Sequence, residues 1–248
     1  MMRRLRSAQI VRSAVAGAAL LVPACATNGQ EGDEAQGDPY RRARLAMVEL
    51  IEARGVRDSA TLTAMRLVPR HEFVPAPYRD QAYRDHPLPI GYDQTISQPY
   101  IVALMTEALE LVPGTKVLEV GTGSGYQAAV LAAMGAEVFT IELLEPLAIG
   151  ARGRLARLGF GNVTVRHGDG YLGWKEEAPF DAVIVTAAPE EIPAPLTDQL
   201  RPGGRLVIPV GPVGAVQLLQ LVAKAEDGTL TTTVLLPVRF VPMREGPP

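Results

Sequence analysis

The feature that most constrains the fold is an alternation of short apolar runs with longer helical segments between Lys116 and Pro209. The apolar runs are rich in valine, isoleucine and leucine, and the segments between them have helical spacing. The expected strands are 116–120, 137–141, 163–166, 180–186 and 205–209, and the expected helices are 126–134, 146–158 and 196–200. Strands that alternate with helices form right-handed crossovers. We therefore expect an α/β fold with a doubly wound, mainly parallel sheet and helices on both faces.

The segments on either side of this alternation extend the same domain. Residues 217–225 and 231–241 read as an antiparallel pair of strands at one edge of the sheet. Upstream, a helical lead-in from Tyr40 onward can be closed by Gly55, and further helices are expected at 60–67 and 98–111. The stretch 71–96 is so rich in proline and aromatic residues that we expect an ordered loop region. We expect a single domain over 40–248. Within it, 40–112 forms the helical and substrate-loop part, and 113–248 the cofactor-binding sheet and terminal strands.

Composition excludes several classes of function. The formal net charge is −3, so the chain lacks the basic field that holds a nucleic-acid backbone. Cys25 is the only cysteine, and the three histidines are widely spaced. Because metal sites need grouped thiolate, imidazole or carboxylate ligands, we expect no metal and no nucleic-acid partner.

A glycine-rich turn follows the first strand of the alternation. Gly121, Gly123 and Gly125 have the spacing Gly-x-Gly-x-Gly, which lets the backbone turn sharply and lets a ligand approach closely. This spacing lacks the third glycine position of the dinucleotide fingerprint, and no Gly-Lys-Ser/Thr follows. The turn therefore predicts a ligand site that binds neither a dinucleotide nor a nucleoside triphosphate.

One acidic residue lies at the end of each of the first three strands. Glu119 can receive an ammonium group, Glu142 can accept hydrogen bonds from both ribose hydroxyls, and Asp169, followed by Gly170, can contact an adenine amino group. The alternative is that these are ordinary strand-end carboxylates. Because ligands of a doubly wound sheet bind at the carboxyl ends of the strands, we expect S-adenosylmethionine, which carries all three groups.

Four further motifs make the resemblance specific. They are Arg66-x-x-Pro69-Arg70-His71-x-Phe73-Val74-Pro75, Leu88–Pro99, Gly168-Asp169-Gly170-x-x-Gly173-Trp174-x-x-x-Ala178-Pro179-Phe180-Asp181, and Pro237–Pro242. With the glycine-rich turn they resemble class I methyltransferases with a Rossmann-like fold, and more narrowly the protein-L-isoaspartate O-methyltransferase family. The usual isoleucine after the third motif is Val183. The resemblance covers about 45–244.

This resemblance implies an enzyme and a mechanism. Family members transfer a methyl group from S-adenosylmethionine to the free α-carboxylate of L-isoaspartyl residues in damaged proteins, and the ester then closes to a succinimide. The resemblance places Ser97 at the active site, and Thr95, Ile96, Phe240 and Val241 beside the substrate. Ser97 can also simply cap the helix that starts at Pro99. Two other functions stay open: a class I methyltransferase for another small molecule or RNA, and a non-catalytic, envelope-anchored relative.

Residues 1–39 differ in character from the rest of the chain. Four arginines lie within the first twelve residues, and an apolar run from Ser13 to Val22 leads to Cys25. This order is typical of a secretory signal, and Cys25 resembles the lipidated cysteine of a bacterial lipoprotein, followed by a disordered tether. The alternative is a basic extension before an internal start at Met47. Methyl-donor supply favours the cytoplasm, whereas lipidation of Cys25 implies export and a membrane anchor. We expect a monomer.

Overall fold

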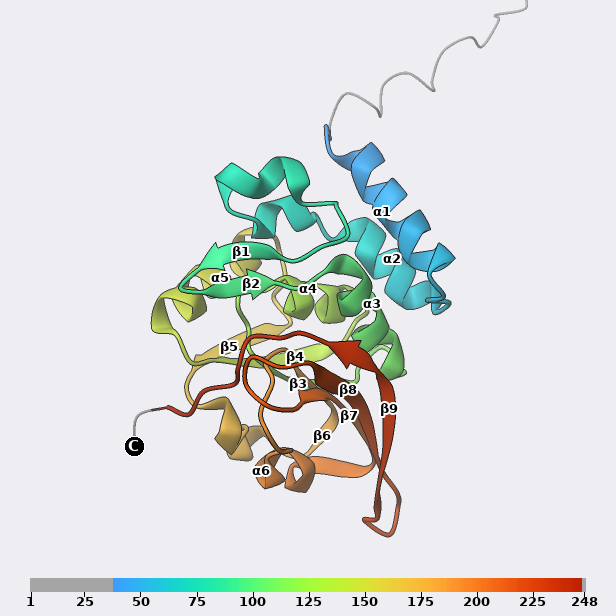
Figure 1. Cartoon of the computed structure of the whole chain (residues 1–248), viewed down its shortest axis with the longest axis vertical. Coiled ribbons are helices and arrows are strands. Elements are labelled where there is room, and N and C mark those ends of the chain that lie inside the picture. Colours follow the sequence, from blue (N-terminus) through green and yellow to red (C-terminus); the bar gives the residue numbers. More distant parts are fainter. Residues whose placement is uncertain (1–37, 247–248) are drawn as a thin grey trace, which may run out of the picture. The chain divides into compact units, whose positions relative to one another are not determined.

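The fold is built around a seven-stranded sheet (Figure 1). The computed structural model describes residues 38–246. The strands lie in the order β5-β4-β3-β6-β7-β8-β9. Their bounds are β3 (Lys116–Val120), β4 (Glu137–Glu142), β5 (Val163–His167), β6 (Phe180–Val185), β7 (Leu200–Val210), β8 (Gln217–Lys224) and β9 (Leu230–Val238). The first five strands of this order pair in parallel, and β8 and β9 pair antiparallel. The prediction of a mainly parallel sheet with antiparallel terminal strands is confirmed.

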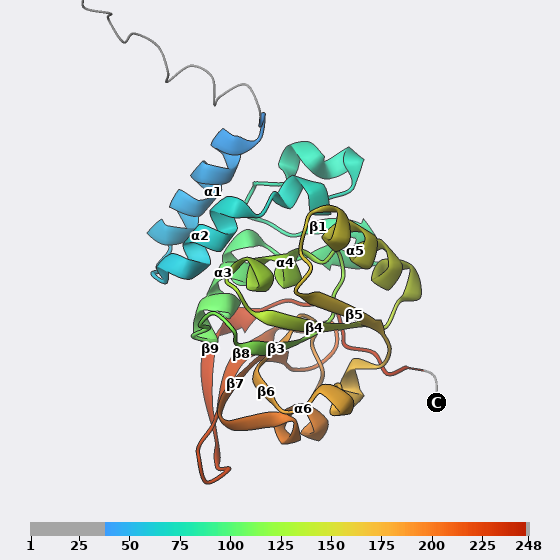
Figure 2. The same cartoon turned by 180° about the vertical axis from the view of Figure 1, so that it is seen from behind.

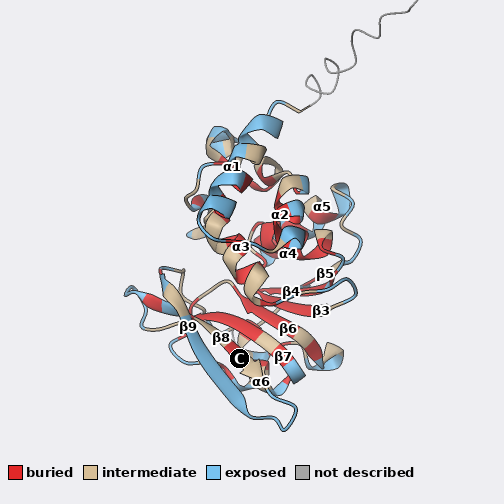
Figure 3. Ribbon diagram, turned by 90° about the vertical axis from the view of Figure 1, so that its right-hand side faces the viewer, coloured by how far each residue is buried: buried red, intermediate tan, exposed pale blue. Residues whose placement is uncertain are grey.

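Helices cover both faces of the sheet (Figures 1 and 2). Their bounds are α1 (Arg41–Ala53), α2 (Ser59–Leu67), α3 (Pro99–Ala108), α4 (Tyr126–Ala133), α5 (Glu145–Arg157) and α6 (Ala194–Asp198). Side chains alternate between the two faces along each strand. Val117 of β3 therefore packs in the core under α1 to α5, whereas Leu118 packs in a second core against Leu196 of α6. Figure 3 shows the buried central strands and the exposed edge strand β9.

The helical lead-in packs directly on the sheet. α2 begins after Asp58, whose side chain accepts a hydrogen bond from the amide of Thr61 at 2.8 Å, as expected of a helix cap. Ile51 of α1 and Met65 of α2 are fully buried in the same core as Val117 of the sheet. The residues between 40 and 112 therefore share their hydrophobic core with the sheet.

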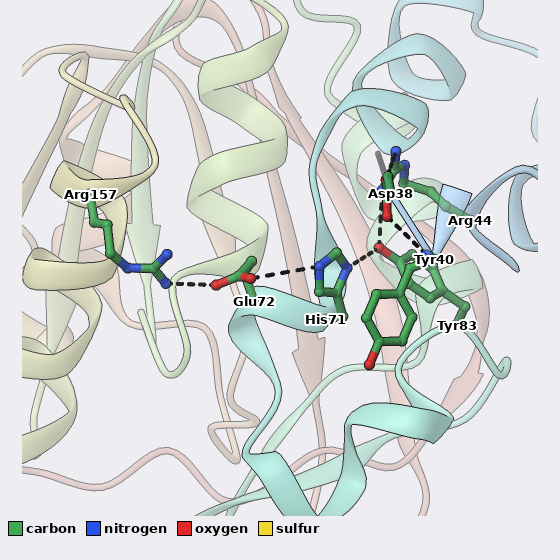
Figure 4. A network of polar contacts seen from close by, with 7 residues as sticks. All are labelled: Asp38, Tyr40, Arg44, His71, Glu72, Tyr83 and Arg157. Atoms are coloured by element: carbon green, nitrogen blue, oxygen red, sulfur yellow. Dashed lines mark hydrogen bonds and ion pairs between the residues drawn. The ribbon is translucent and has the colours of Figure 1, made fainter. Parts of the chain in front are cut away.

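A chain of polar contacts further joins this lead-in to α5 (Figure 4). Arg157 of α5 pairs with Glu72 at 2.8 Å, and Glu72 lies 3.6 Å from the ring of His71. The other ring nitrogen of His71 lies 2.7 Å from the hydroxyl of Tyr83, which accepts a hydrogen bond from Arg44 of α1. Polar contacts thus run from α5 through the segment around His71 to the first helix.

The largest differences from the sequence prediction concern four segments. The region 71–96 is not only loop: it holds the 3-10 helices η2 (Arg70–Phe73) and η3 (Ala76–Gln81) and a hairpin of β1 (Leu88–Gly91) and β2 (Gln94–Ile96). The hairpin turns through Tyr92 and Asp93, both with positive φ, and its strands are too short to give a periodic signal. Leu200 was expected in a helix but begins β7, α3 ends at Ala108, and β9 ends at Val238.

No helix among residues 38–246 combines the length and the apolar character that a bilayer crossing requires. The signal-like segment with Cys25 lies outside the described residues.

Candidate active site

The site lies at the carboxyl ends of the two central strands, β3 and β6, from which the chain continues in opposite directions. Between β3 and β6 the strand order reverses, and such a switch point is where doubly wound sheets bind ligands. Gly121 follows β3 and Thr186 follows β6. The hydroxyl of Thr186 donates to the carbonyl of Gly121 at 2.6 Å. A Cβ on Gly121 would lie 2.4 Å from this hydroxyl oxygen, so a side chain there would displace Thr186.

Two cavities meet at this edge. A smaller one, of about 80 Å³, lies over the glycine-rich turn and is lined by Gly121, Gly123, Glu142 and Gly170. A groove of about 490 Å³ lies beside it and is lined by Ser97 and Phe240. The residues that line both cavities are Thr95, Thr186 and Val241. A ligand in the first cavity and a ligand in the groove can therefore meet at these three residues.

Glu142 fixes the glycine-rich turn to the end of β4. One carboxylate oxygen accepts a hydrogen bond from the amide of Gly123 at 2.7 Å, and the other accepts from the amide of Leu144 at 2.9 Å. A carboxylate has about four lone-pair positions, so both oxygens can still accept a hydroxyl group. Glu142 lines the smaller cavity, which is the position expected of a residue that binds a ribose.

Glu119 lies behind the cavity rather than in its wall. It is fully buried on the face of β3 that α4 covers, and one oxygen accepts a hydrogen bond from the hydroxyl of Thr140, which in turn lies 2.6 Å from that of Thr122. Burial raises the pKa of Glu119 to about 8. Its other oxygen, Oε1, has no hydrogen-bond partner among the described residues. This free oxygen is the acceptor that an ammonium group, reached through water, would satisfy.

Gly170 lines the smaller cavity, and Asp169 lies next to it in the chain. Asp169 accepts hydrogen bonds from the amides of Tyr171 at 2.8 Å and Gly246 at 2.9 Å, so its carboxylate holds the end of the described chain. Gly170 lines the cavity, whereas Asp169 stands just outside the lining. A Cβ on Gly170 would lie 2.3 Å from a methyl carbon of Val120, which explains the glycine.

Gly125 has a structural position. It is the N-cap of α4 with a φ of 87°, and a Cβ there would lie 3.2 Å from Leu155 of α5. Gly123, in contrast, lines the cavity. The structure thus places Gly121, Gly123 and Gly170 in the lining of the smaller cavity, and Gly125 in the packing of α4 on α5.

The hairpin and the segment after β9 form the walls of the groove. Thr95 of β2 is exposed and borders both cavities, Ser97 lines the groove, and the neighbouring Ile96 turns into the core. Across the groove, the amide of Phe240 donates to the side chain of Gln217 at 3.0 Å, and the carbonyl of Val241 accepts from the amide of Ala188 at 2.8 Å. These bonds hold Phe240 and Val241 in place opposite the hairpin.

Sequence reasoning missed Thr186 as a site residue. The apolar pattern places it as the last residue of a strand, whereas in the structure it lines both cavities. Its place directly after the fourth strand of the alternation was the available signal, because that strand borders the switch point. Gln94 and Met243, which also line the smaller cavity, carried no such signal.

The residues of the smaller cavity fit S-adenosylmethionine. The free oxygen of Glu119, the spare acceptor positions of Glu142 and the bare backbone at Gly121 and Gly170 match an ammonium, a ribose and a flat base. Among residues 38–246, no three histidine, cysteine, aspartate or glutamate side chains are grouped so as to hold a metal ion. The sheet order and this cavity together define a class I methyltransferase.

Comparisons with known proteins identify a family within this class of methyltransferases. The family model described as protein-L-isoaspartate(D-aspartate) O-methyltransferase matches residues 42–247. A relative from Polaromonas sp., protein-L-isoaspartate O-methyltransferase 2, is 60% identical over 186 residues, which cover 75% of this chain and 88% of the relative. A relative of the same name from Syntrophobacter fumaroxidans is 53% identical over 237 residues, with 92% and 95% covered.

Two solved structures support the same family. One, a protein-L-isoaspartate O-methyltransferase, has a TM-score of 0.74 and 31% identity, and the match covers 80% of this chain and 65% of that one. A second, a Plasmodium falciparum protein solved with S-adenosyl-L-homocysteine, has a TM-score of 0.69 and 26% identity, with 81% and 98% covered. The chain belongs to the protein-L-isoaspartate(D-aspartate) O-methyltransferase family and is an S-adenosylmethionine-dependent enzyme.

Proposed function

We propose that this chain methylates the free α-carboxylate of L-isoaspartyl residues in damaged proteins and so starts their repair through a succinimide. The observation that carries the proposal is the junction of the smaller cavity with the groove at Thr95, Thr186 and Val241. The groove also suits an anionic substrate, because the described residues that line it include Arg239 and no acid, whereas its other arginine, Arg54, is paired with Asp85. Family membership supports the same reaction.

Methyl transfer to a carboxylate requires no proton transfer by the protein. Bound S-adenosylmethionine supplies a methyl group on a positively charged sulfur. The accepting carboxylate is ionised at neutral pH, since carboxyl groups have a reference pKa near 4. The residues therefore need to align the carboxylate, and such alignment is worth about 7–11 kcal/mol in favourable cases. We assign this task to Ser97, whose hydroxyl can donate to a carboxylate in the groove.

The peptide itself is proposed to lie along the segment after β9. The amide of Phe240 and the carbonyl of Val241 already have partners within the described chain. The carbonyl of Phe240 and the amide of Val241 are then the groups that this segment can offer to a substrate backbone, in the manner of an added strand. Thr95 and Ile96 would complete the opposite wall, with Ile96 holding the hairpin to the core.

For the cofactor we propose the assignments made from the sequence. Glu142 binds the ribose hydroxyls, Asp169 and Gly170 the adenine, and Glu119 the ammonium through water. Gly121 and Gly123 allow close approach of the turn, and Gly125 supports the turn through its packing on α5.

The test is a comparison of three matched reactions. The purified enzyme is incubated with labelled S-adenosylmethionine and an isoaspartyl peptide, its ordinary aspartyl twin, or a ribosomal RNA fragment. We expect label only in the isoaspartyl peptide, as a base-labile ester. Equal labelling of both peptides, or label in the RNA alone, would favour the alternative of a methyltransferase for another substrate. No labelling, together with no binding of the donor by calorimetry, would favour the non-catalytic relative.

We further propose a monomer with one methyltransferase domain over 40–248, preceded by a signal-like segment. The two locations remain distinct proposals. Methyl-donor supply favours a cytoplasmic enzyme, whereas lipidation of Cys25 would anchor an exported one to a membrane. Mass spectrometry of the native protein decides between them: an intact N-terminus without added mass supports the cytoplasm, and a chain that begins at a lipidated Cys25 supports export.

A further inference from the structure

Arg70, at the start of η2, is fully buried although its charge takes no part in the proposed chemistry. Its Nε donates to the carbonyl of Ala82 at 2.8 Å, and its Nη2 donates to the carbonyl of Ser97 at 2.7 Å. Arg70 thus holds the backbone of Ser97, which lines the groove.

Keeping this guanidinium in the core is costly. Burial lowers the pKa of Arg70 to about 10, which still leaves the group protonated near neutral pH. The ring of Tyr126 lies 4.7 Å from the guanidinium carbon and offsets part of the cost. Nη1, however, has no hydrogen-bond partner among the described residues. If this position only filled the core, an apolar side chain of similar size would do so without the cost of burying a charge.

Asp85 holds the other end of the same segment. Its side chain is 10% exposed, and its two oxygens accept from the side-chain amide of Gln98 and the backbone amide of Tyr100, each at 2.9 Å. Asp85 also pairs with Arg54, whose guanidinium stacks on the ring of Tyr100. Because α3 begins without a side-chain cap from Gln98, Asp85 satisfies a free amide of its first turn.

We propose that Arg70 and Asp85 are positioning residues that hold Ser97 and the start of the helix after it, and so fix the Ser97 hydroxyl against the groove. Arg70 fixes the carbonyl of Ser97 itself, and Asp85 fixes Gln98 and Tyr100, which follow it in the chain. An error of about 1 Å in such a position can cost about a hundredfold in rate. The inference rests on the proposed role of Ser97.

The test is a double-mutant cycle on turnover of the isoaspartyl peptide. Arg70→Lys keeps the charge but replaces the planar fork, which can donate to two carbonyls at once, by a single ammonium. We expect Arg70→Lys to lower kcat about tenfold or more and to leave the dissociation constant of S-adenosylmethionine within about twofold. Ser97→Ala should lower kcat by up to about a hundredfold. In the Ser97→Ala background, Arg70→Lys should cost less than about twofold, because residues that act as a unit are not additive.

Asn162 provides the matched control. Its side-chain amide also donates to two backbone carbonyls, those of Ala132 and Ala136, but at the start of β5. Asn162→Ala should lower the melting temperature and leave kcat within about twofold. If Arg70→Lys does not fold, as judged by thermal melting, Asp85→Asn takes its place in the same cycle, because it removes one of the two acceptors that hold Gln98 and Tyr100.

The outcomes separate the two proposals. If Ser97→Ala leaves kcat unchanged, the role of Ser97 is wrong and the positioning role goes with it. If Ser97→Ala slows turnover and Arg70→Lys or Asp85→Asn slows it by the same factor in both backgrounds, only the positioning role is overturned. A penalty that appears with Ser97 and disappears without it supports the inference.

Discussion

At the scale of single residues, the carboxyl group of Glu119 is a buried group with an unused hydrogen-bonding position. It is fully buried, its pKa is raised to about 8 by desolvation, and one of its oxygens has no partner among the described residues. Near neutral pH the ligand-free protein therefore holds this group mainly protonated. A carboxyl group whose pKa is higher in the folded protein than in the unfolded chain resists ionisation, and this makes stability depend on pH.

The first prediction follows from the direction of this pKa shift. The stabilisation from protonated Glu119 is complete below about pH 4.5 and is lost as the pH rises toward about 8. We expect Glu119→Gln to remove a slope of up to about 1.4 kcal/mol per pH unit from the unfolding free energy in that window. Urea unfolding of both proteins from pH 5 to pH 8, without ligand, measures it. Parallel stability curves for the two proteins would contradict the raised pKa.

A second prediction concerns Glu142. Glu142→Ala should weaken S-adenosylmethionine binding by about 1–3 kcal/mol, because hydrogen bonds to a charged acceptor are lost. Glu137, exposed at the opposite end of the same strand, is the matched control, and Glu137→Ala should bind as the wild type does. Calorimetry gives both dissociation constants. An unaltered affinity of Glu142→Ala would remove this residue from the ribose site.

At the scale of secondary-structure elements, the segment after β9 depends on one side chain. Gln217, at the start of β8, is buried and accepts a hydrogen bond from the amide of Phe240. This contact replaces the strand pairing that ends at Val238. The position of Phe240 opposite the hairpin thus rests on a buried amide group, while the neighbouring Val241 is held by its bond to Ala188.

The third prediction is that Gln217→Ala loosens this wall of the groove. We expect KM for the isoaspartyl peptide to rise about fivefold to tenfold, the effect of about 1–1.4 kcal/mol, with little change in donor affinity. Gln220, on the same strand and without a side-chain hydrogen bond among the described residues, is the control. A change in donor affinity alone would assign Gln217 to the cofactor pocket instead.

The elements also show what a sequence can and cannot predict. The five central strands and the helices between them follow from apolar periodicity, and their bounds were predicted to within a few residues, apart from residues 200–204 at the start of β7. The hairpin of β1 and β2 could not be found this way, because three- and four-residue strands carry no period. The spacing of the acidic residues at the strand ends predicted Glu142, which lines the smaller cavity, whereas the roles proposed for Glu119 and Asp169 stay predictions. Thr186 and Arg70 could not be singled out from the sequence, because their positions depend on contacts with residues far away in the chain.

At the scale of the whole molecule, a chain of polar contacts joins α5 to the lead-in (Figure 4). His71 lies in the middle of this chain, between Glu72 and Tyr83. Burial lowers the pKa of His71; Glu72 and Asp38 oppose the shift, while Arg44 and Arg79 add to it. The folded protein therefore takes up a proton on this ring less readily than the unfolded chain does.

The fourth prediction is acid destabilisation that begins near neutral pH. As the pH falls below about 6.5, the unfolded chain gains the proton first, so the unfolding free energy should decrease. His71→Gln should abolish this part of the pH dependence, whereas His167→Gln, at an exposed histidine, should retain it. Thermal melts between pH 5 and pH 7.5 compare the three proteins. If His71→Gln loses stability in acid as steeply as the wild type, the acid sensitivity lies elsewhere.

The wall that the two cavities share has a consequence for how the site tolerates change. Thr95, Thr186 and Val241 line both the smaller cavity over the glycine-rich turn and the groove. A bulkier side chain at any of these three positions would therefore intrude on two binding spaces at once.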